Sequence, residues 1–262
     1  MKTNYHTHTK RCLHAGGTEE EYVQAALAAG LSVLGFTDHT PFPDHDFGMR
    51  MPYSDLAPYF AEVDRLKKQY AGDLIIRKSL EIEYLPQYAE YYQFLLNTYH
   101  PDYLLLGEHF YFNETGDVFN IYDAESTADY LNYAKSIAAA LKTGLFQVVA
   151  HPDLFTVNHL AWDRNCDEAS EIILAAARET GSVLEFNANG YRRGLHDYPD
   201  ERRYMYPHMN FWKKATGTGI QVIIGADAHE PGQVWDSCMD KAIQVLRDMG
   251  IEPMESLESI LK

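Results

Sequence analysis

The sequence predicts an α/β fold: a distorted seven-stranded (β/α)7 barrel, TIM-like, in a single domain. Three observations lead to this prediction. Short apolar runs alternate with helical stretches along the whole chain, several of the runs are apolar on both faces, and glycines stand where helix C-terminal caps are expected. This alternation favours parallel strands joined by right-handed crossovers. An open doubly wound sheet is the alternative.

The predicted strands and helices follow one another in chain order. The strands are 2–9, 32–38, 74–84, 103–109, 145–151, 182–189 and 221–229. The helices are 19–29, 56–70, 89–99, 127–143, 167–180, 206–215, 234–249 and 255–261. Long loops are expected at 40–53, 110–123 and 190–204. Because no linker interrupts the chain, we predict one domain over 1–262.

The charge and the cysteines restrict the class of partner and the compartment. The net charge of -16 argues against nucleic acid and anionic membranes, which both favour an excess of Lys and Arg. Twelve histidines in so acidic a chain supply, with the carboxylates, the ligands that Zn, Mn or Fe prefer. The three cysteines form no Cys-x-x-Cys pair, and no signal peptide or membrane-length apolar run is seen. These features predict a cytoplasmic protein, and they leave its oligomeric state open.

Metal-type residues gather where the predicted strands end. The residues in question are His6, His8, Asp38, His39, Glu81, Glu83, Glu108, His109, His151, Asp153, Glu185, Asp227 and His229. The carboxyl ends of barrel strands form one rim, and barrel enzymes keep their active sites there. Each motif alone is a weak signal, but their coincidence with the strand ends predicts a metal site on that rim.

Spacing supports some of these motifs better than others. His6 and His8 are two residues apart, so a strand directs both to one side. Neighbours such as Glu108 and His109 would diverge unless the strand has ended or bulges, which the preceding glycine allows. Asp38 is either a ligand or the acceptor that orients a ligand histidine. Glu83 is expected to face solvent or cap a turn.

The motifs, in this order, resemble the PHP family, named for polymerase and histidinol phosphatase. The match runs through His6-Thr7-His8, Thr37-Asp38-His39, Glu81, Gly107-Glu108-His109, His151-Pro152-Asp153 and Asp227-Ala228-His229. Within the family, the chain looks like the monofunctional histidinol-phosphate phosphatases. The resemblance implies a distorted seven-stranded barrel that holds three divalent ions, with Zn, Mn and Fe all suited to such ligands.

The resemblance also implies a ligand set for each ion. One ion would take His6, His8, Glu81 and Asp227. A second would share Glu81 as a bridge and take His109 and His151. The third would take His14, His39, Glu108 and His229.

The reaction that follows is hydrolysis of a small phosphate monoester. The resemblance points to conversion of L-histidinol phosphate to L-histidinol and phosphate in histidine biosynthesis. A metal-bridged hydroxide would attack phosphorus, and Asp227 or His229 would handle the proton. Arg192, and second Arg164, are the candidates for binding the phosphate. Two alternatives remain: a broader PHP phosphoesterase or exonuclease acting on nucleotides or oligonucleotides, and a metal-binding module without catalysis.

Overall fold

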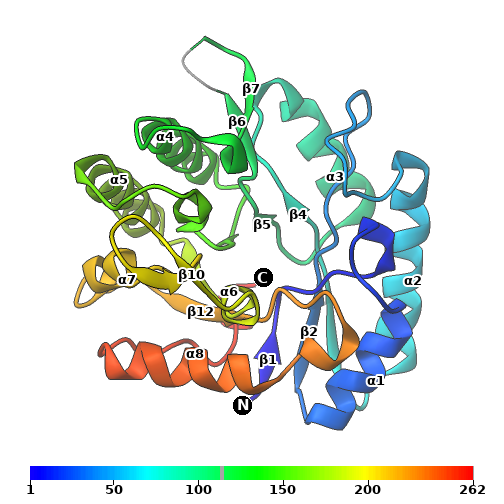
Figure 1. Ribbon diagram of the computed structural model, residues 1–262. Helices are drawn as coiled ribbons and strands as arrows, with labels where there is room; N and C mark the ends of the chain where they lie inside the picture. Colours follow the sequence, from blue (N-terminus) through cyan, green and yellow to red (C-terminus); the bar gives the residue numbers. More distant parts are fainter. Residues whose placement is uncertain (113–114, 262) are drawn as a thin grey trace.

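Parallel strands form a ring at the centre of the molecule, with helices outside it (Figure 1). The computed structural model describes residues 1–112 and 115–261. One sheet has the order β1-β2-β3, and the other has the order β12-β9-β8-β5-β4. Isolated bridges between Thr7 and Ala228 and between His39 and Glu81 connect the two sheets at both ends. Because β3 and β4 follow one another as one interrupted strand, seven strand units surround one centre, and the α/β prediction is confirmed.

The strands are shorter than the sequence predicts. The central ones are β1 Thr3–Asn4, β2 Val33–Phe36, β3 Ile75–Lys78, β4 Glu81–Ile82, β5 Leu105–Leu106, β8 Val148–Val149, β9 Val183–Asn187 and β12 Val222–Gly225. The residues after several strands leave the ladder to turn inward. His151 and Asp227 do so at φ of 28° and 47°, in the left-handed region that side chains other than glycine rarely adopt.

Most helices lie where the sequence predicts them. They are α1 Glu19–Ala29, α2 Leu56–Gln69, α3 Ala89–Tyr99, α4 Asp129–Lys142, α5 Arg164–Thr180, α6 Asn189–Arg192, α7 Met209–Ala215 and α8 Ser237–Asp248. Short 3-10 helices occupy Lys10–Cys12, Tyr53–Asp55, Pro86–Tyr88, Ile121–Asp123, Leu154–Val157 and Pro231–Gln233. Asp163 and Asp236 cap α5 and α8, and each accepts hydrogen bonds from backbone N–H groups of the first turn. Within the described chain, every helix is too short or too polar to cross a membrane.

Two of the predicted loops contain hairpins. In the loop at 110–123, β6 Phe110–Phe112 pairs with β7 Val118–Asn120, while its residues 113–114 lie outside the described residues. In the loop at 190–204, β10 Leu195–Asp197 pairs with β11 Arg202–Tyr204. Both hairpins are antiparallel and lie outside the central ring, which is why the seven-strand pattern does not include them.

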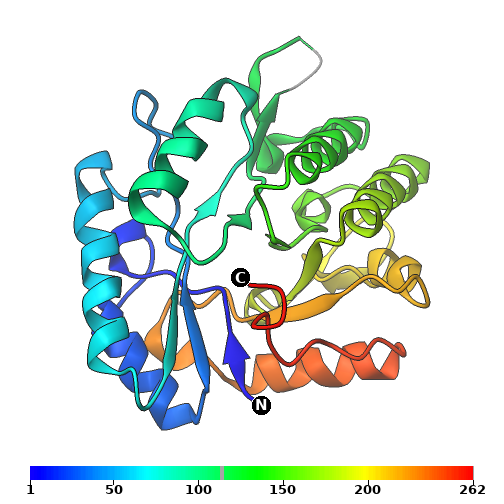
Figure 2. The ribbon, with the colours of Figure 1, turned by 180° about the vertical axis from the view of Figure 1, so that it is seen from behind.

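The predicted helix at 255–261 is wrong, because this segment instead crosses the back of the ring (Figure 2). The backbone N–H of Met254 donates to the carbonyl of Val222, and Leu257 is fully buried against the apolar interior of the ring. The Leu257 N–H also donates to the hydroxyl of Tyr5. The C-terminal segment therefore seals the end of the barrel that faces away from the histidines.

Candidate metal centre

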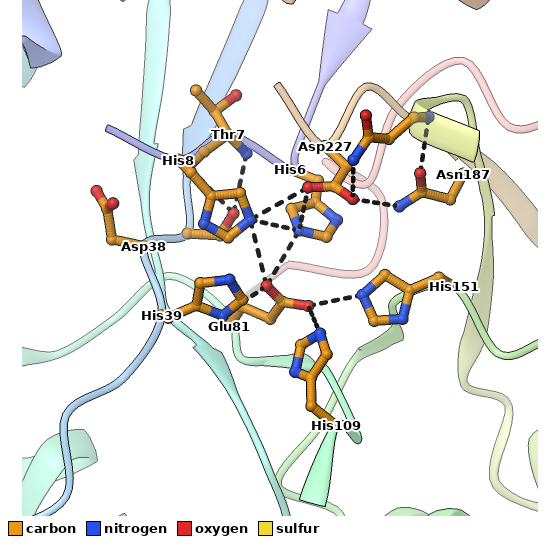
Figure 3. Close-up of polar contacts among 12 residues, drawn as sticks. His6, Thr7, His8, Asp38, His39, Glu81, His109, His151, Asn187 and Asp227 are labelled. Atoms are coloured by element: carbon orange, nitrogen blue, oxygen red, sulfur yellow. Dashed lines mark hydrogen bonds and ion pairs between the residues drawn. The ribbon is translucent and has the colours of Figure 1, made fainter. Parts of the chain in front are cut away.

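Glu81 lies at the centre of the predicted cluster, fully surrounded by imidazoles (Figure 3). Its Oε2 lies 3.3 Å from His6 Nε2 and 3.2 Å from His8 Nε2, and 3.1 Å from His39 Nδ1. Its Oε1 lies 2.8 Å from His151 Nε2. His109 Nε2 is 3.6 Å from the same oxygen. Five histidines from four strand ends thus converge on one carboxylate, because His6 and His8 both follow β1.

Asp227 faces the same imidazoles from the end of β12. Its Oδ1 lies 3.6 Å from His6 Nε2 and 3.3 Å from His8 Nε2. Its Oδ2 accepts hydrogen bonds from the side-chain amides of Asn187 and Asn189, at 3.2 and 3.1 Å. These amides fix the carboxylate, so Asp227 presents Oδ1 to the histidines.

Glycine is required next to this cluster because a carboxylate packs against the backbone. A Cβ on Gly107 would collide with the side chain of Glu81, and one on Gly225 would collide with that of Glu185. The sequence argument used Gly107 to permit an irregular strand end. The structure gives it a second purpose, since it makes room for the central carboxylate.

Glu185 orients a histidine in the way that was predicted for Asp38. Its Oε1 lies 2.8 Å from His6 Nδ1, and its Oε2 accepts from the backbone N–H of His151. Asp38 instead accepts both the N–H and the hydroxyl of Thr9, and its carboxylate points away from the imidazoles in Figure 3. Asp38 therefore supports the backbone between the histidines and does not contact a ring.

The electrostatics of the cluster favour a bound cation. Burial alone would lower the pKa of His6, but the carboxylates of Glu185, Asp227 and Glu81 outweigh it and raise the pKa to about 10. Burial alone would raise the pKa of Glu81, yet the imidazoles of His39 and His6 hold it well below its usual value. The buried carboxylates therefore favour positive charge at the cluster.

The donor atoms also fit metal ions. Buried atoms without a hydrogen-bond partner in the described chain include Glu81 Oε2, His39 Nδ1 and His151 Nδ1. Nitrogens of two rings face each other, with His6 Nε2 3.0 Å from His8 Nε2. Among the described residues, five groups have ligand atoms within 4.8 Å of one another: His6-His8-Glu81, His6-His151-Asp227, His39-Glu81-His109, His14-His39-His229 and His8-Cys12-His229. Unsatisfied nitrogen and oxygen donors in this number are what divalent transition metals bind.

The third predicted ligand set is only partly assembled. His14 Nε2 lies 3.0 Å from His229 Nε2, and the His14 and His39 rings are 5.2 Å apart. Glu108 is not with them. It is fully buried behind the cluster, where it accepts from the backbone N–H of Tyr84 at 2.9 Å and from the hydroxyl of Ser136.

The predicted phosphate arginines both lie elsewhere. Arg192 Nε donates to Asp236 at 2.7 Å, and its Nη1 donates to the carbonyl of Ala226. Arg164 is exposed at the first turn of α5. A cavity of about 620 Å³ opens above the cluster. Arg193, the neighbour of Arg192, is among the described residues that line it, whereas Arg192 and Arg164 are not. The Arg193 guanidinium lies 5.6 Å from the ring of Tyr206.

Comparison with known proteins identifies the family of this site. The family model described as the PHP domain matches residues 4–189. The chain belongs to the PHP family. A "Probable histidinol-phosphatase" from Deinococcus radiodurans is 33% identical to this PHP chain, covering 94% of it and 92% of the relative. A "Histidinol-phosphatase" from Bacillus subtilis is 26% identical, covering 89% of this chain and 96% of the relative.

A solved PHP-type structure has the same fold. The histidinol phosphate phosphatase from Lactococcus lactis, crystallised with Zn, L-histidinol and phosphate, superposes with a TM-score of 0.72. It is 17% identical in sequence, and the match covers 97% of this chain and 95% of that one. At this identity the likeness concerns the arrangement of the barrel.

Sequence reasoning assigned no role to Glu185 or Arg193, and it misplaced Glu83. Glu185 was noted at a strand end, and its place two residues before Asn187 puts both side chains on the same face of the strand. Arg193 could not be preferred over Arg192 from the sequence, because residue spacing does not predict side-chain direction in a loop. Glu83 was expected at the surface, but it is buried and its Oε1 lies 3.0 Å from His109 Nδ1.

Proposed function

We propose that this chain hydrolyses L-histidinol phosphate to L-histidinol and phosphate, as a metal-dependent phosphomonoesterase of histidine biosynthesis. The observation that supports this most is the convergence of imidazoles on Glu81 and Asp227 beneath an open cavity that Arg50 and Arg193 help to line. The names of the PHP relatives point to the same substrate. The cytoplasmic location predicted from the cysteines belongs to this proposal, and all three are unpaired.

Three divalent ions are proposed, with ligand sets that follow the observed placements. The first set is His6, His8, Glu81 and Asp227. The second is Glu81, His109 and His151. The third is His14, His39 and His229. Glu108 is left out because its carboxylate points away from the cluster and accepts hydrogen bonds from Tyr84 and Ser136. Zn, Mn and Fe all suit these mixed donors.

The chemistry divides between the ions and the chain. Bound divalent ions lower the pKa of water and neutralise the charge of a phosphate ester. In this proposal, Asp227 takes the proton of the attacking water and passes it to the leaving alkoxide. Burial would raise the pKa of Asp227, but His6 and His8 hold it well below its usual value, so the carboxylate is ionised. Burial and the nearby His8 lower the pKa of His229 to about 4, which suits a neutral ligand rather than an acid.

Arg193 is proposed to bind the phosphate in place of Arg192. Its side chain is exposed to the cavity, whereas the donors of Arg192 are engaged by Asp236 and by backbone carbonyls. An arginine fork matches two phosphate oxygens, and such charge-assisted bonds are strong where water is partly excluded. The substrate would therefore lie with its phosphate between Arg193 and the cluster.

A substrate panel tests this function against its main rival. Phosphate release would be measured from L-histidinol phosphate, nucleoside monophosphates and single-stranded oligonucleotides under one metal condition. We expect kcat/KM to be highest for L-histidinol phosphate. Preference for nucleotides or oligonucleotides would replace it with the broader phosphoesterase or exonuclease, which the charge of -16 disfavours.

A further inference from the structure

Glu83 lies two residues beyond the central carboxylate but behind the cluster. It is buried, and its Oε1 lies 3.0 Å from His109 Nδ1. The other ring nitrogen, His109 Nε2, is the one that faces Glu81. A carboxylate on Nδ1 keeps the proton there, so Nε2 is left with a free electron pair directed at the cluster.

The same Glu83 oxygen accepts a hydrogen bond from Nη2 of Arg50. Arg50 comes from a distant part of the chain, the segment between β2 and α2, and is only 8% exposed. A carboxylate buried so close to Glu81 would carry a large desolvation cost without a partner. The arginine provides that partner and holds the Glu83 carboxylate away from the proposed ion sites.

Arg50 is itself held in place from two sides. Its guanidinium carbon lies 5.5 Å from the ring of Phe47 and 5.2 Å from the ring of Phe110, and Nη1 donates to the carbonyl of Gly48 at 2.9 Å. Phe110 directly follows His109 in the chain. The guanidinium therefore connects the 40–53 segment with the residues that carry the histidine.

We propose that Arg50 and Glu83 are a positioning pair for His109. Glu83 fixes the ring and its tautomer, and Arg50 holds the Glu83 carboxylate in place against the ring. Arg50, Phe47 and Met49 also line the cavity. The pair therefore connects the cavity wall, where the substrate would bind, with the proposed metal ligand His109. This inference rests on the proposed metal centre and adds the residues that set the geometry of its second ion.

The test compares Arg50→Ala, Arg50→Lys and Glu83→Gln in the metal-loaded full-length protein. Metal retention during titration with a chelator is measured without substrate, together with ¹⁵N chemical shifts of the histidine rings in the zinc-loaded form. We expect Arg50→Ala and Glu83→Gln to release one ion about 10–100 times more readily than the parent protein. Arg50→Lys should fall between the parent and Arg50→Ala, because it restores the charge without the planar fork. The His109 ring signals should shift in all three variants.

A matched control is Arg192→Ala, which removes an arginine bonded to a carboxylate outside the cluster. It should leave metal retention unchanged. Parent-like metal retention and unchanged His109 signals in Arg50→Ala, even with a higher KM, would overturn the proposal and leave Arg50 as a wall residue only. Since retention is measured without substrate, this result is distinct from failure of the proposed phosphatase, which would appear as metal-loaded parent protein that does not cleave L-histidinol phosphate.

Discussion

Arg192 and Arg193 are neighbours in the chain, but their guanidinium groups have different surroundings. Arg193 lines the cavity, so Arg193→Ala should raise KM for L-histidinol phosphate roughly 10- to 100-fold through loss of charge-assisted bonds. Metal content should not change. Steady-state kinetics with elemental analysis checks this, and an unchanged KM would exclude Arg193 from phosphate binding.

Arg192→Ala serves as the comparison, with a different expected effect. It removes bonds to Asp236, which caps α8, and to the carbonyl of Ala226 at the end of β12. Thermal denaturation should show a loss of about 1–3 kcal/mol of stability. A large rise in KM without loss of stability would instead restore Arg192 as the phosphate residue.

The pKa of Glu108 allows a test of the position of this residue behind the cluster. Burial raises its pKa from 4.5 to about 8. The stabilisation from the neutral carboxyl is therefore complete below pH 4.5 and is lost as pH rises through about 8. Glu108→Gln keeps a similar shape without the titration, so its stability relative to the parent protein should increase between pH 5 and 8.

Thermal denaturation across that pH range, with elemental analysis, measures the effect of Glu108→Gln. Metal content should equal that of the parent protein. Loss of one ion from this variant would show that Glu108 is a ligand, as the resemblance to PHP proteins first implied.

At the scale of the elements, the strand ends decide whether the site can form. Gly107→Ala introduces a Cβ that collides with Glu81, so we expect loss of bound metal and a fall in kcat of at least about tenfold. Gly72→Ala is the matched control, since a Cβ there meets nothing within 4 Å. Equal metal content and equal kcat in the two variants would contradict the close packing of strand and carboxylate.

The elements and the site were predictable from sequence to different degrees. Apolar runs and caps place the helices well, because these signals are local: α1 and α3 have the predicted bounds. Strand lengths were overestimated, since residues such as His151 and Asp227 leave the ladder in conformations that no pattern of residues reveals. The histidines at the strand ends could be located from the strand pattern, whereas the direction of Glu108 depends on packing against Ser136 from α4, far along the chain.

At the scale of the whole molecule, the two ends of the barrel have separate roles. Leu257 of the C-terminal segment is fully buried at the end opposite the histidines. Leu257→Ala should therefore cost about 2–5 kcal/mol of stability while metal content and KM stay unchanged. Chemical denaturation with elemental analysis would detect this, and loss of metal would show that the two ends are coupled.

The central claim is that the strand ends assemble a metal cluster that cleaves phosphate esters. The most direct measurement removes the metal from purified protein with a chelator, restores it, and follows phosphate release from L-histidinol phosphate with elemental analysis at each step. We predict bound divalent metal at the start, loss of phosphate release with the metal, and recovery of both together. Full metal occupancy without phosphate release from this or any other ester would contradict the account and favour a metal-binding module without catalysis.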